Sequence, residues 1–590
     1  MTASAEGRRP DTGWRTVFME MLTGAREAAQ RLPVTTLFLL AAALQANLVA
    51  ADIHLFGEDS QGLPSDTNFD VGLGLVAGAT ASLAVTLRGE ARKVSSAKTL
   101  PLALLAGIVA CLVLALPDHF LTLEWAVMLG LVALVPIAPF IGRGDSSAFW
   151  IFAARSAFAV LLGVLALLLF AGGISAILAS LTYLFGIPVP DDLYGHVWLS
   201  TGLFAAPLFG LGQLPDRFDE TPGEALQGFM DRGMRALGDF VAAPLLILYA
   251  IILHLYAMKI AVTGEVPQGQ IGWLVLTYGF CIFAALIIIN PFFDRARAPT
   301  RAFLRLWPFF LPIPLVLLAY ALMLRVGEFG ITPERYLLGL FGLVTALLLA
   351  LQLLARVRGD IRAIAALPAA ALILGGFGPQ GALGVSIASQ ASRFLEIVNN
   401  SPVEGERHKE ALGALSFLAA RDALARVLPE GLPASALESD SHPYRTVAKA
   451  WGLDPDRLGP NRRALPLNDR SRPTAFTAAG FDTVIQPVRL AVDMKEPVTV
   501  RLPEGKEIVF ALEADALVVI ADGQSTLFPV AASRIEALAQ LDVDAPAQLR
   551  LEADGRALQL IPTYLYIDPG PPLRLENLEA TVLLRTEDWR

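Results

Sequence analysis

Eleven long apolar stretches in the first two thirds of the chain constrain the fold more than any other feature of this sequence. A helix that crosses the hydrocarbon core of a bilayer, about 30 Å thick, needs roughly 20 mostly apolar residues. Each stretch is close to this length, so each is predicted to form a membrane-spanning helix. They lie at 34–53, 70–87, 100–116, 121–141, 149–172, 196–214, 237–261, 271–291, 306–325, 336–355 and 363–386. The chain is therefore predicted to be a polytopic α-helical membrane bundle.

The basic residues fall almost wholly on one side of these spans. Twenty Lys and Arg residues lie in the segments that share a side with the N-terminus, whereas the alternate loops contain none, at 54–69, 117–120, 173–195, 262–270 and 326–334. Cytoplasmic loops carry the positive excess. We therefore expect a cytoplasmic N-terminus and, after eleven spans, a C-terminal region outside the cytoplasm. The same rule makes 149–186 a single span that continues outward, as one long helix or as a span followed by an interfacial helix.

The chain changes character near residue 392, where the long apolar runs stop. Beyond residue 481, apolar residues alternate with polar ones, as at Val498, Val500 and Leu502, which is typical of half-buried strands. We predict four parts: a cytoplasmic interfacial amphipathic segment at 1–33, a transmembrane helical domain at 34–390, a helical and linker segment at 391–480, and a β-rich extracytoplasmic domain at 481–590. The predicted fold class is thus a bundle of about eleven transmembrane helices followed by a soluble β-rich α+β domain of seven or eight short strands.

Several classes of function do not fit this sequence. The net charge of −9 argues against nucleic acid as a partner, because a phosphate backbone requires a concentrated basic face. The six histidines show no paired metal-ligand spacing, and neither a nucleophile elbow nor a Walker A sequence is present. We accordingly predict no catalytic residue, no cofactor and no metal site.

One glycine-rich stretch matches the dinucleotide fingerprint by letter. Gly376, Gly378 and Gly381 have its spacing, but they interrupt the last predicted span and enclose Pro379. The fingerprint requires a strand before it and a helix after it in a βαβ unit. We therefore interpret this stretch as a helix break or close-packing point.

Three motifs resemble the bacterial membrane-protein family called domain of unknown function 4153. The first is Leu255–Glu265, where a span ends in Lys259 and a Thr-Gly-Glu turn, and the second is Arg325–Tyr336, with its Ile-Thr-Pro-Glu-Arg sequence. The third is Phe377-Gly378-Pro379, followed by Val385-Ser386 and Ser389-Gln390. The resemblance covers most of residues 30–400. It implies a bacterial inner-membrane protein and carries no assigned activity.

Ionisable and phenolic residues within spans or at their ends are the remaining candidates, because burying a charge in lipid is costly. The candidate intramembrane polar residues are Asp239, His254, Tyr256 and Arg155, the last of which is expected to reach toward the inner surface. A second group approaches the outer face in the predicted topology: Lys259, Glu265, Arg325, Glu328, Glu334 and Arg335. We hypothesise that this group forms a shared polar platform that docks the C-terminal domain or a headgroup-like ligand. The simpler alternative is a set of independent span ends that extend to the interface.

The predicted function is a non-enzymatic binding or assembly component of the cell envelope, located in the bacterial inner membrane with a periplasmic C-terminal domain. The scarcity of ionisable residues at mid-depth favours this interpretation. The alternative is a secondary transporter or exporter of a lipid-linked or small substrate, and a membrane transferase is a third class. The expected partners are the lipid bilayer and an envelope protein or lipid; the sequence leaves the oligomeric state open.

Overall fold

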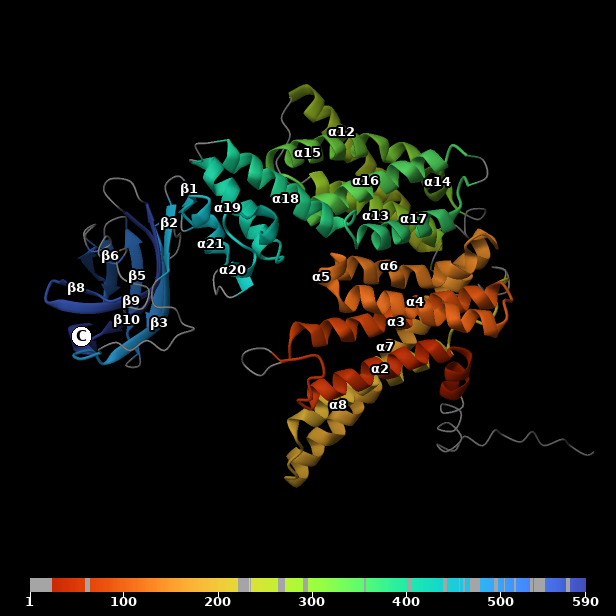
Figure 1. Ribbon diagram of the computed structural model, residues 1–590, viewed down its shortest axis with the longest axis horizontal. Helices are drawn as coiled ribbons and strands as arrows, with labels where there is room; N and C mark the ends of the chain where they lie inside the picture. Colours follow the sequence, from red (N-terminus) through yellow and green to blue (C-terminus); the bar gives the residue numbers. More distant parts are fainter. Residues whose placement is uncertain are drawn as a thin grey trace, which may run out of the picture. The chain divides into compact units, whose positions relative to one another are not determined.

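The computed structural model describes residues 24–589 apart from short gaps, of which the longest are 221–232, 467–477 and 539–546. The chain divides into two compact units, Met1–Ser389 and Gln390–Arg590. Figure 1 shows the first unit as a set of long helices and the second as a smaller helical part followed by β-sheets. The predicted amphipathic segment 1–33 falls mostly outside the described residues, which begin in a helical segment at 24–31.

Among the described residues, eight helices or helix pairs of the first unit are long and apolar enough to cross a membrane. They are α2 (Pro33–Ala50), α3 (Asp66–Ala91), α4 (Ser96–Ala115), α7 (Ser146–Phe185), η3 with α12 (Gly238–Ala242 and Ala243–Thr263), α13 (Ile271–Ile289), α14 with α15 (Ala298–Phe310 and Pro312–Phe329) and α16 (Pro333–Leu351). The structure thus supports a multi-span membrane protein. Two of the remaining predicted spans correspond to shorter apolar helices.

The shorter helices are α6 (Glu124–Ile137) with η1 (Ala138–Phe140) and α17 (Ile361–Gly375). The predicted span 196–214 falls on a continuous run of α8 (Asp191–Ser200), η2 (Thr201–Ala205) and α9 (Ala206–Gly212). The last predicted span, 363–386, is wrong as a single helix. The helix ends at Gly375 and resumes only with α18 (Ala382–Asn399).

The glycine-rich stretch 376–381 causes this break. Gly378 has a φ of +81°, which disfavours any other residue there. The carbonyl of Gly376 accepts the amide of Leu123 at 2.6 Å, and the amide of Gly378 donates to Phe120 at 2.6 Å, at the end of α5 (Pro117–Phe120). Backbone groups that would bond within a helix are therefore bonded to a neighbouring loop, and the predicted helix break is confirmed.

The stretch 149–186 forms part of one continuous helix, α7, of 40 residues. Asp145 begins it by accepting the amide of Ala148, and Gly186 ends it with a φ of +65°. At 1.5 Å per residue this helix is roughly 60 Å long, about twice the thickness of a hydrocarbon core.

Small residues bring α3 and α4 into close contact. A methyl group at Gly74 would lie 2.6 Å from the carbonyl oxygen of Cys111, and one at Gly78 would lie 2.9 Å from that of Gly107. The ring of Phe38, from α2, lies against both Gly78 and Gly107. Such close backbone approach is the usual basis of helix association in membranes, where hydrocarbon provides no hydrophobic driving force.

The second unit begins with helices and continues as two antiparallel sheets. The helices after α18 are α19 (Glu406–Ala419), η5 (Leu424–Val427), α20 (Ser435–Glu438) and α21 (Pro443–Ala450). One sheet has the order β1-β2-β9-β10-β3 with β8 also on β9, and the other has the order β4-β5-β6-β7. The strands of the first sheet are β1 (Arg457–Gly459), β2 (Arg462–Pro466), β3 (Thr483–Ala491), β8 (Leu549–Ala553), β9 (Arg556–Asp568) and β10 (Arg574–Leu584). The strands of the second sheet are β4 (Val498–Arg501), β5 (Glu507–Glu513), β6 (Ala516–Ala521) and β7 (Gln524–Pro529).

Residues from both sheets share one apolar core, which includes Phe510, Phe528, Leu558, Val582 and, from the terminal turn η6 (Thr586–Trp589), Trp589. The predicted strand-rich region is confirmed, but the linker predicted up to residue 480 is wrong at 457–466. There β1 and β2 extend the sheet through the antiparallel pairing of β2 with β9. The sequence of this segment shows no alternation of apolar and polar residues. Its strands could not be predicted locally, because backbone pairing with a distant strand decides their conformation.

Candidate functional site

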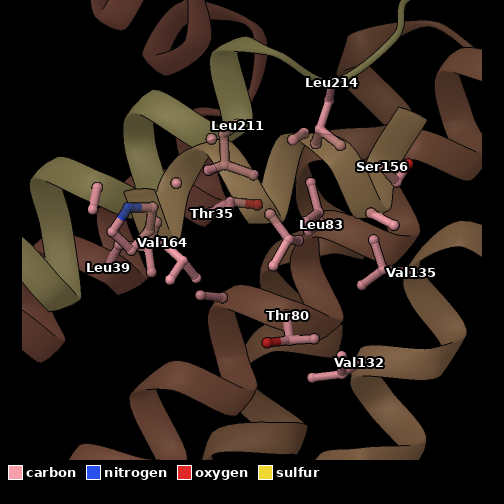
Figure 2. A pocket seen from close by; sticks show the side chains of 18 of the residues that line it. Thr35, Leu39, Thr80, Leu83, Val132, Val135, Ser156, Val164, Leu211 and Leu214 are labelled. Carbon is pink, nitrogen blue, oxygen red and sulfur yellow. The ribbon is translucent and has the colours of Figure 1, made fainter. Parts of the chain in front are cut away.

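A cavity of about 700 Å³ lies within the first unit, among α2, α3, α6, α7 and the η2–α9 segment. Its lining is almost entirely aliphatic, with Leu39, Leu83, Val135, Val164 and Leu211 among the side chains seen in Figure 2. Ligand pockets in proteins commonly measure about 300–1,000 Å³. The cavity is thus large enough for a ligand, and its walls suit one that is mostly hydrocarbon.

Three hydroxyl groups line this cavity, and two of them are already bonded. Thr35 lies 3.0 Å from the hydroxyl of Ser82, and Thr80 donates to the carbonyl of Val76 in its own helix. The third, Ser156, is 7% exposed, and its buried oxygen has no hydrogen-bond partner among the described residues. A buried hydroxyl without a partner is costly. Ser156 is therefore a buried polar group in the wall of the cavity with no partner among the described residues.

The cavity opens sideways. Val132, Val160 and Val164 belong to its lining, yet they are 52%, 66% and 48% exposed. Such residues on membrane helices face the acyl chains of the bilayer. The position of these valines at the rim provides an entrance from the hydrocarbon region rather than from water.

The wall formed by α7 and α9 depends on small residues four apart on each helix. A methyl group at Gly163 would lie 3.3 Å from the carbonyl oxygen of Ala206, and one at Gly210 would lie 3.2 Å from that of Ala159. This is the small-xxx-small pattern of close helix crossings in membranes. The π-helical turn η2 directly precedes this contact and places Gly202 in the lining. Single π-turns occur frequently at functional sites.

A network of hydrogen bonds centred on Arg31 lies beside the end of the cavity at Leu214. Arg31 bonds both carboxylate oxygens of Glu90 at 3.0 and 2.8 Å, and donates to the carbonyls of Leu214 and Pro215 at 2.9 and 2.8 Å. Leu214 is itself a lining residue. Arg31 therefore ties the helical segment before α2, the end of α3 and the segment after α9 together where the cavity ends.

Arg155 lies at the same end, adjacent to Ser156 in α7. Its Nη1 donates to Glu220 at 2.8 Å, and its side chain is 48% exposed while that of Glu220 is 17% exposed. The ring of Phe218 packs on Phe152 with centroids 5.2 Å apart, which holds the segment carrying Glu220 against α7. Arg155 thus pairs with the segment after α9, and it is not one of the residues that line the cavity.

Arg362 forms a second network of contacts between loops. Arg362 donates to the carbonyls of Arg143 and Gly144, and its guanidinium bonds the carboxylate of Asp360, which also accepts a hydrogen bond from Ser146. Burial alone would raise the pKa of Asp360, but the hydrogen bonds and charge of Arg362 and the hydrogen bond from Ser146 lower it below its usual value. This network joins the loop before α7 to the start of α17.

All four predicted intramembrane residues, Arg155 included, lie outside the cavity lining. Asp239, 6% exposed in the π-helical turn η3, accepts the amide of Arg297 at 3.0 Å, just before α14. His254 lies 2.7 Å through Nδ1 from the carbonyl of Ala250, one turn earlier in α12. Tyr256 packs in an apolar cluster of its own. Each of these residues therefore has its own structural contact, and these contacts do not bring Asp239, His254 and Tyr256 into one site.

The six residues of the predicted outer platform are only partly described. Glu265 lies outside the described residues, and Lys259 is exposed. Arg335 donates to the carbonyls of Phe329 and Gly330 and lies over the Phe329 ring, so it completes the C-terminal end of α15. Within the described part of the chain, Arg325 and Glu328 form no ion pair. The platform stays a prediction.

Sequence reasoning missed Ser156, Arg31 and Glu90 as parts of a site. Ser156 lies inside a long uncharged run, where a single serine is ordinary, and Arg31 and Glu90 lie 59 positions apart. A conserved pairing pattern is the signal that would have joined the last two.

The helices, the cavity and the sheets together define a multi-span membrane protein with a β-rich C-terminal region. The chain belongs to the family described as Domain of unknown function (DUF4153), whose model matches residues 34–383. The resemblance noted in the sequence is thereby confirmed. A protein of Pasteurella multocida (strain Pm70), described as uncharacterized, is 28% identical over 103 residues, which is 17% of this chain and 17% of that protein. The chain thus matches about a sixth of the length of this curated relative. No solved structure shows a significant match.

Proposed function

We propose that this protein is a non-enzymatic binding component of the bacterial cell envelope, and that its membrane part holds a lipid or lipid-linked amphiphile. The cavity of about 700 Å³ among α2, α3, α6, α7 and α9 carries this proposal. Its aliphatic lining and its rim of half-exposed valines match a molecule that is mostly hydrocarbon.

The aliphatic lining of the cavity favours an apolar occupant, because walls that contact no other atoms lose their dispersion attraction. Water is a poor occupant because the aliphatic walls offer few partners. Acyl chains from the surrounding bilayer are the available filling.

Lipid retention in variants with a filled cavity tests this proposal. Phenylalanine at Ala133 and Ala153, both in the lining, occupies the space, whereas Leu129→Phe adds a ring on α6 at a lipid-facing residue outside the lining. Each protein is extracted in a lipid-preserving polymer, passed briefly through detergent and examined by native mass spectrometry. We expect a stoichiometric lipid on the wild type and on Leu129→Phe, and its loss on Ala133→Phe/Ala153→Phe. Equal lipid content in all three proteins would refute the proposal.

We also propose that the N-terminus is cytoplasmic and that the C-terminal region is periplasmic, as the distribution of Lys and Arg indicates. A phosphatase that is active only outside the cytoplasm, fused after Arg590, tests this orientation. We expect high phosphatase activity from this fusion and low activity from a fusion in the loop around Arg143. The reverse pattern would invert the proposed topology.

The alternative function is a transporter or exporter of a lipid-linked or small substrate. The π-helical turns η2 and η3 and the helix break at 376–381 favour it, because transporters form their sites at interrupted helices. Movement of a fluorescent lipid between the leaflets of vesicles separates the two functions. A binding component leaves the rate unchanged from protein-free vesicles, whereas a transporter raises it and loses this effect in Ala133→Phe/Ala153→Phe.

The outer platform provides a second proposed contact, with an envelope protein or a lipid headgroup. Lys259, which is exposed at the end of α12, is the clearest residue to test. Charge reversal by Lys259→Glu is expected to weaken capture of an envelope partner without changing stability. Unchanged capture would leave these residues as independent helix ends.

A further inference from the structure

We infer that α14 and the start of α15 form a surface site for an anionic phospholipid, with the phosphate on Arg301 and Arg305 and an acyl chain along Phe309 and Val316. None of these four residues belongs to the lining of the cavity. The site is therefore separate from the cavity, and its occupation does not depend on the proposed function.

The uncharged part of α14 and α15 has the length of one membrane span. Residues 306–324 contain no charged side chain, and a helix of this length is about 28 Å long at 1.5 Å per residue. The hydrocarbon core of a bilayer is about 30 Å thick. Arg305 therefore lies at one end of the hydrocarbon region, and Arg301 lies one helical turn farther out, at the depth of the lipid headgroups.

Arg301, Arg305, Phe309 and Val316 share one exposed face of this helix. With 3.6 residues per turn, positions 301, 305 and 309 are each offset by about 40°, and position 316 falls between 305 and 309. All four side chains are exposed, Phe309 by 71% and Val316 by 68%. Leu311, where α14 meets α15, keeps helical backbone angles, so the spacing continues across the junction. The face thus changes from cationic to apolar at the end of the hydrocarbon region.

The opposite face of α14 holds this orientation in place. Phe303 is fully buried and Trp307 is 4% exposed. Both belong to the apolar core that also contains residues of α12 and α13. The arginine face is therefore directed away from the protein core. A phospholipid beside it would place its phosphate at the two arginines and its chain along the apolar residues.

Arg301 and Arg305 have capacity for a phosphate. Among the described residues, neither guanidinium forms an ion pair or a hydrogen bond. Arg297, one turn earlier, is already engaged, because its guanidinium lies over the ring of Phe240 at 5.0 Å. An arginine carries five N–H donors in a planar fork that matches phosphate oxygens. The phosphate of a zwitterionic lipid is accompanied by its own ammonium group, so two arginines without a carboxylate partner favour an anionic lipid.

Lipid competition in native mass spectrometry of the full-length protein tests this site. The probes are phosphatidylglycerol and phosphatidylcholine with identical chains, added to delipidated protein in detergent at low salt. We expect the wild type to bind phosphatidylglycerol in preference to phosphatidylcholine. Arg301→Gln/Arg305→Gln is expected to lower this preference about thirtyfold, or about 2 kcal/mol, because two cations are lost. An unchanged preference in this variant overturns the inference.

Lys93→Gln/Arg143→Gln is the matched control, because it removes two exposed charges from loops on the same side of the proposed topology. It is expected to keep most of the preference for phosphatidylglycerol. Arg301→Lys/Arg305→Lys retains both charges and is expected to keep part of the preference, which separates the loss of charge from misfolding. Equal losses in the two double Gln variants would show a general effect of surface charge and would overturn the inference.

Two further measurements identify the ligand and its place. Glycerol 3-phosphate is expected not to displace phosphatidylglycerol, because it lacks the chain that contacts Phe309 and Val316; displacement would assign the arginines to a soluble phosphate and overturn the inference. Ala133→Phe/Ala153→Phe, which fills the cavity, is expected to keep the preference for phosphatidylglycerol. If it loses this preference, the phospholipid is bound in the cavity and the surface site is wrong.

Discussion

Replacing Gly78 with alanine measures how much the close contact of α2, α3 and α4 contributes to stability. The added methyl group would lie 2.7 Å from two ring carbons of Phe38 and 2.9 Å from the carbonyl oxygen of Gly107. Carbon atoms pack best at about 3.5–4.0 Å, so either the ring or the helices must move by roughly 1 Å. The ring of Phe38 has little freedom because it also lies against Gly107.

Two opposing contributions to the free energy of unfolding set how much Gly78→Ala changes the stability. Alanine in place of glycine stabilises a helix by about 0.5–1 kcal/mol, and overpacking a well-packed interior costs about 1–3 kcal/mol. Gly173→Ala in α7 is the matched control, because nothing lies within 4 Å of the added methyl group there. We therefore expect Gly78→Ala to be less stable than Gly173→Ala by about 1–3 kcal/mol, with Gly173→Ala slightly more stable than the wild type.

Titration with sodium dodecyl sulfate from mixed micelles, followed by far-ultraviolet circular dichroism, compares the free energies of unfolding. The variant Phe38→Leu provides a second check: combined with Gly78→Ala it is expected to recover part of the loss, which shows as a coupling between the two positions. If Gly78→Ala is as stable as Gly173→Ala, the helices are not packed as closely as the structure shows and the reasoning is refuted.

Three further predictions concern other contacts. Arg31→Gln leaves the Glu90 carboxylate and two carbonyls without their donor and is expected to destabilise the membrane part by about 2 kcal/mol in the same titration; a change below about 0.5 kcal/mol would contradict this. The pKa of Asp482 is lowered by hydrogen bonds from the hydroxyl and amide of Thr586, so its folded value lies below its unfolded one. Its stabilising contribution is therefore present above the unfolded pKa and is lost as pH falls through the folded pKa. Hydrogen exchange at the Thr586 amide should be slow at neutral pH and faster in Asp482→Asn, with the difference disappearing in acid; equal protection at neutral pH would count against it. Trp589→Ala removes a ring that is 2% exposed and is expected to destabilise the β-rich region by about 3–5 kcal/mol, measured by limited proteolysis, and unchanged cleavage would disprove its role in the core.

Local patterns explain what was predictable in the fold. Apolar stretches of span length predict helices such as α2, α12 and α16, because the backbone of a segment in hydrocarbon must bond within itself. The positive φ available to Gly378 and the presence of Pro379 predict the helix break. Alternation at Val498 and Val500 predicts a strand, which is β4. Each of these signals lies within a few residues of the element that it predicts.

Contacts between distant segments explain what was missed. The sequences of β1 and β2 show no alternation of apolar and polar residues. They form strands because β2 pairs antiparallel with β9, about a hundred residues later in the chain. The candidate site also depends on distant segments. Ser156 becomes unusual only when four other segments enclose it, and Arg31 meets Glu90 only when the segment before α2 packs against α3.

The sequence by itself determined that this protein has many apolar segments of membrane-spanning length, that its basic residues concentrate in alternate loops, and that a strand-rich region follows, because hydropathy, charge and alternation act over a few turns of chain. Only the tertiary structure decided that five segments leave an aliphatic cavity between them and that the buried hydroxyl of Ser156 lies in its wall. A cavity is a property of how helices pack, and packing depends on the shapes of side chains that are far apart in the chain.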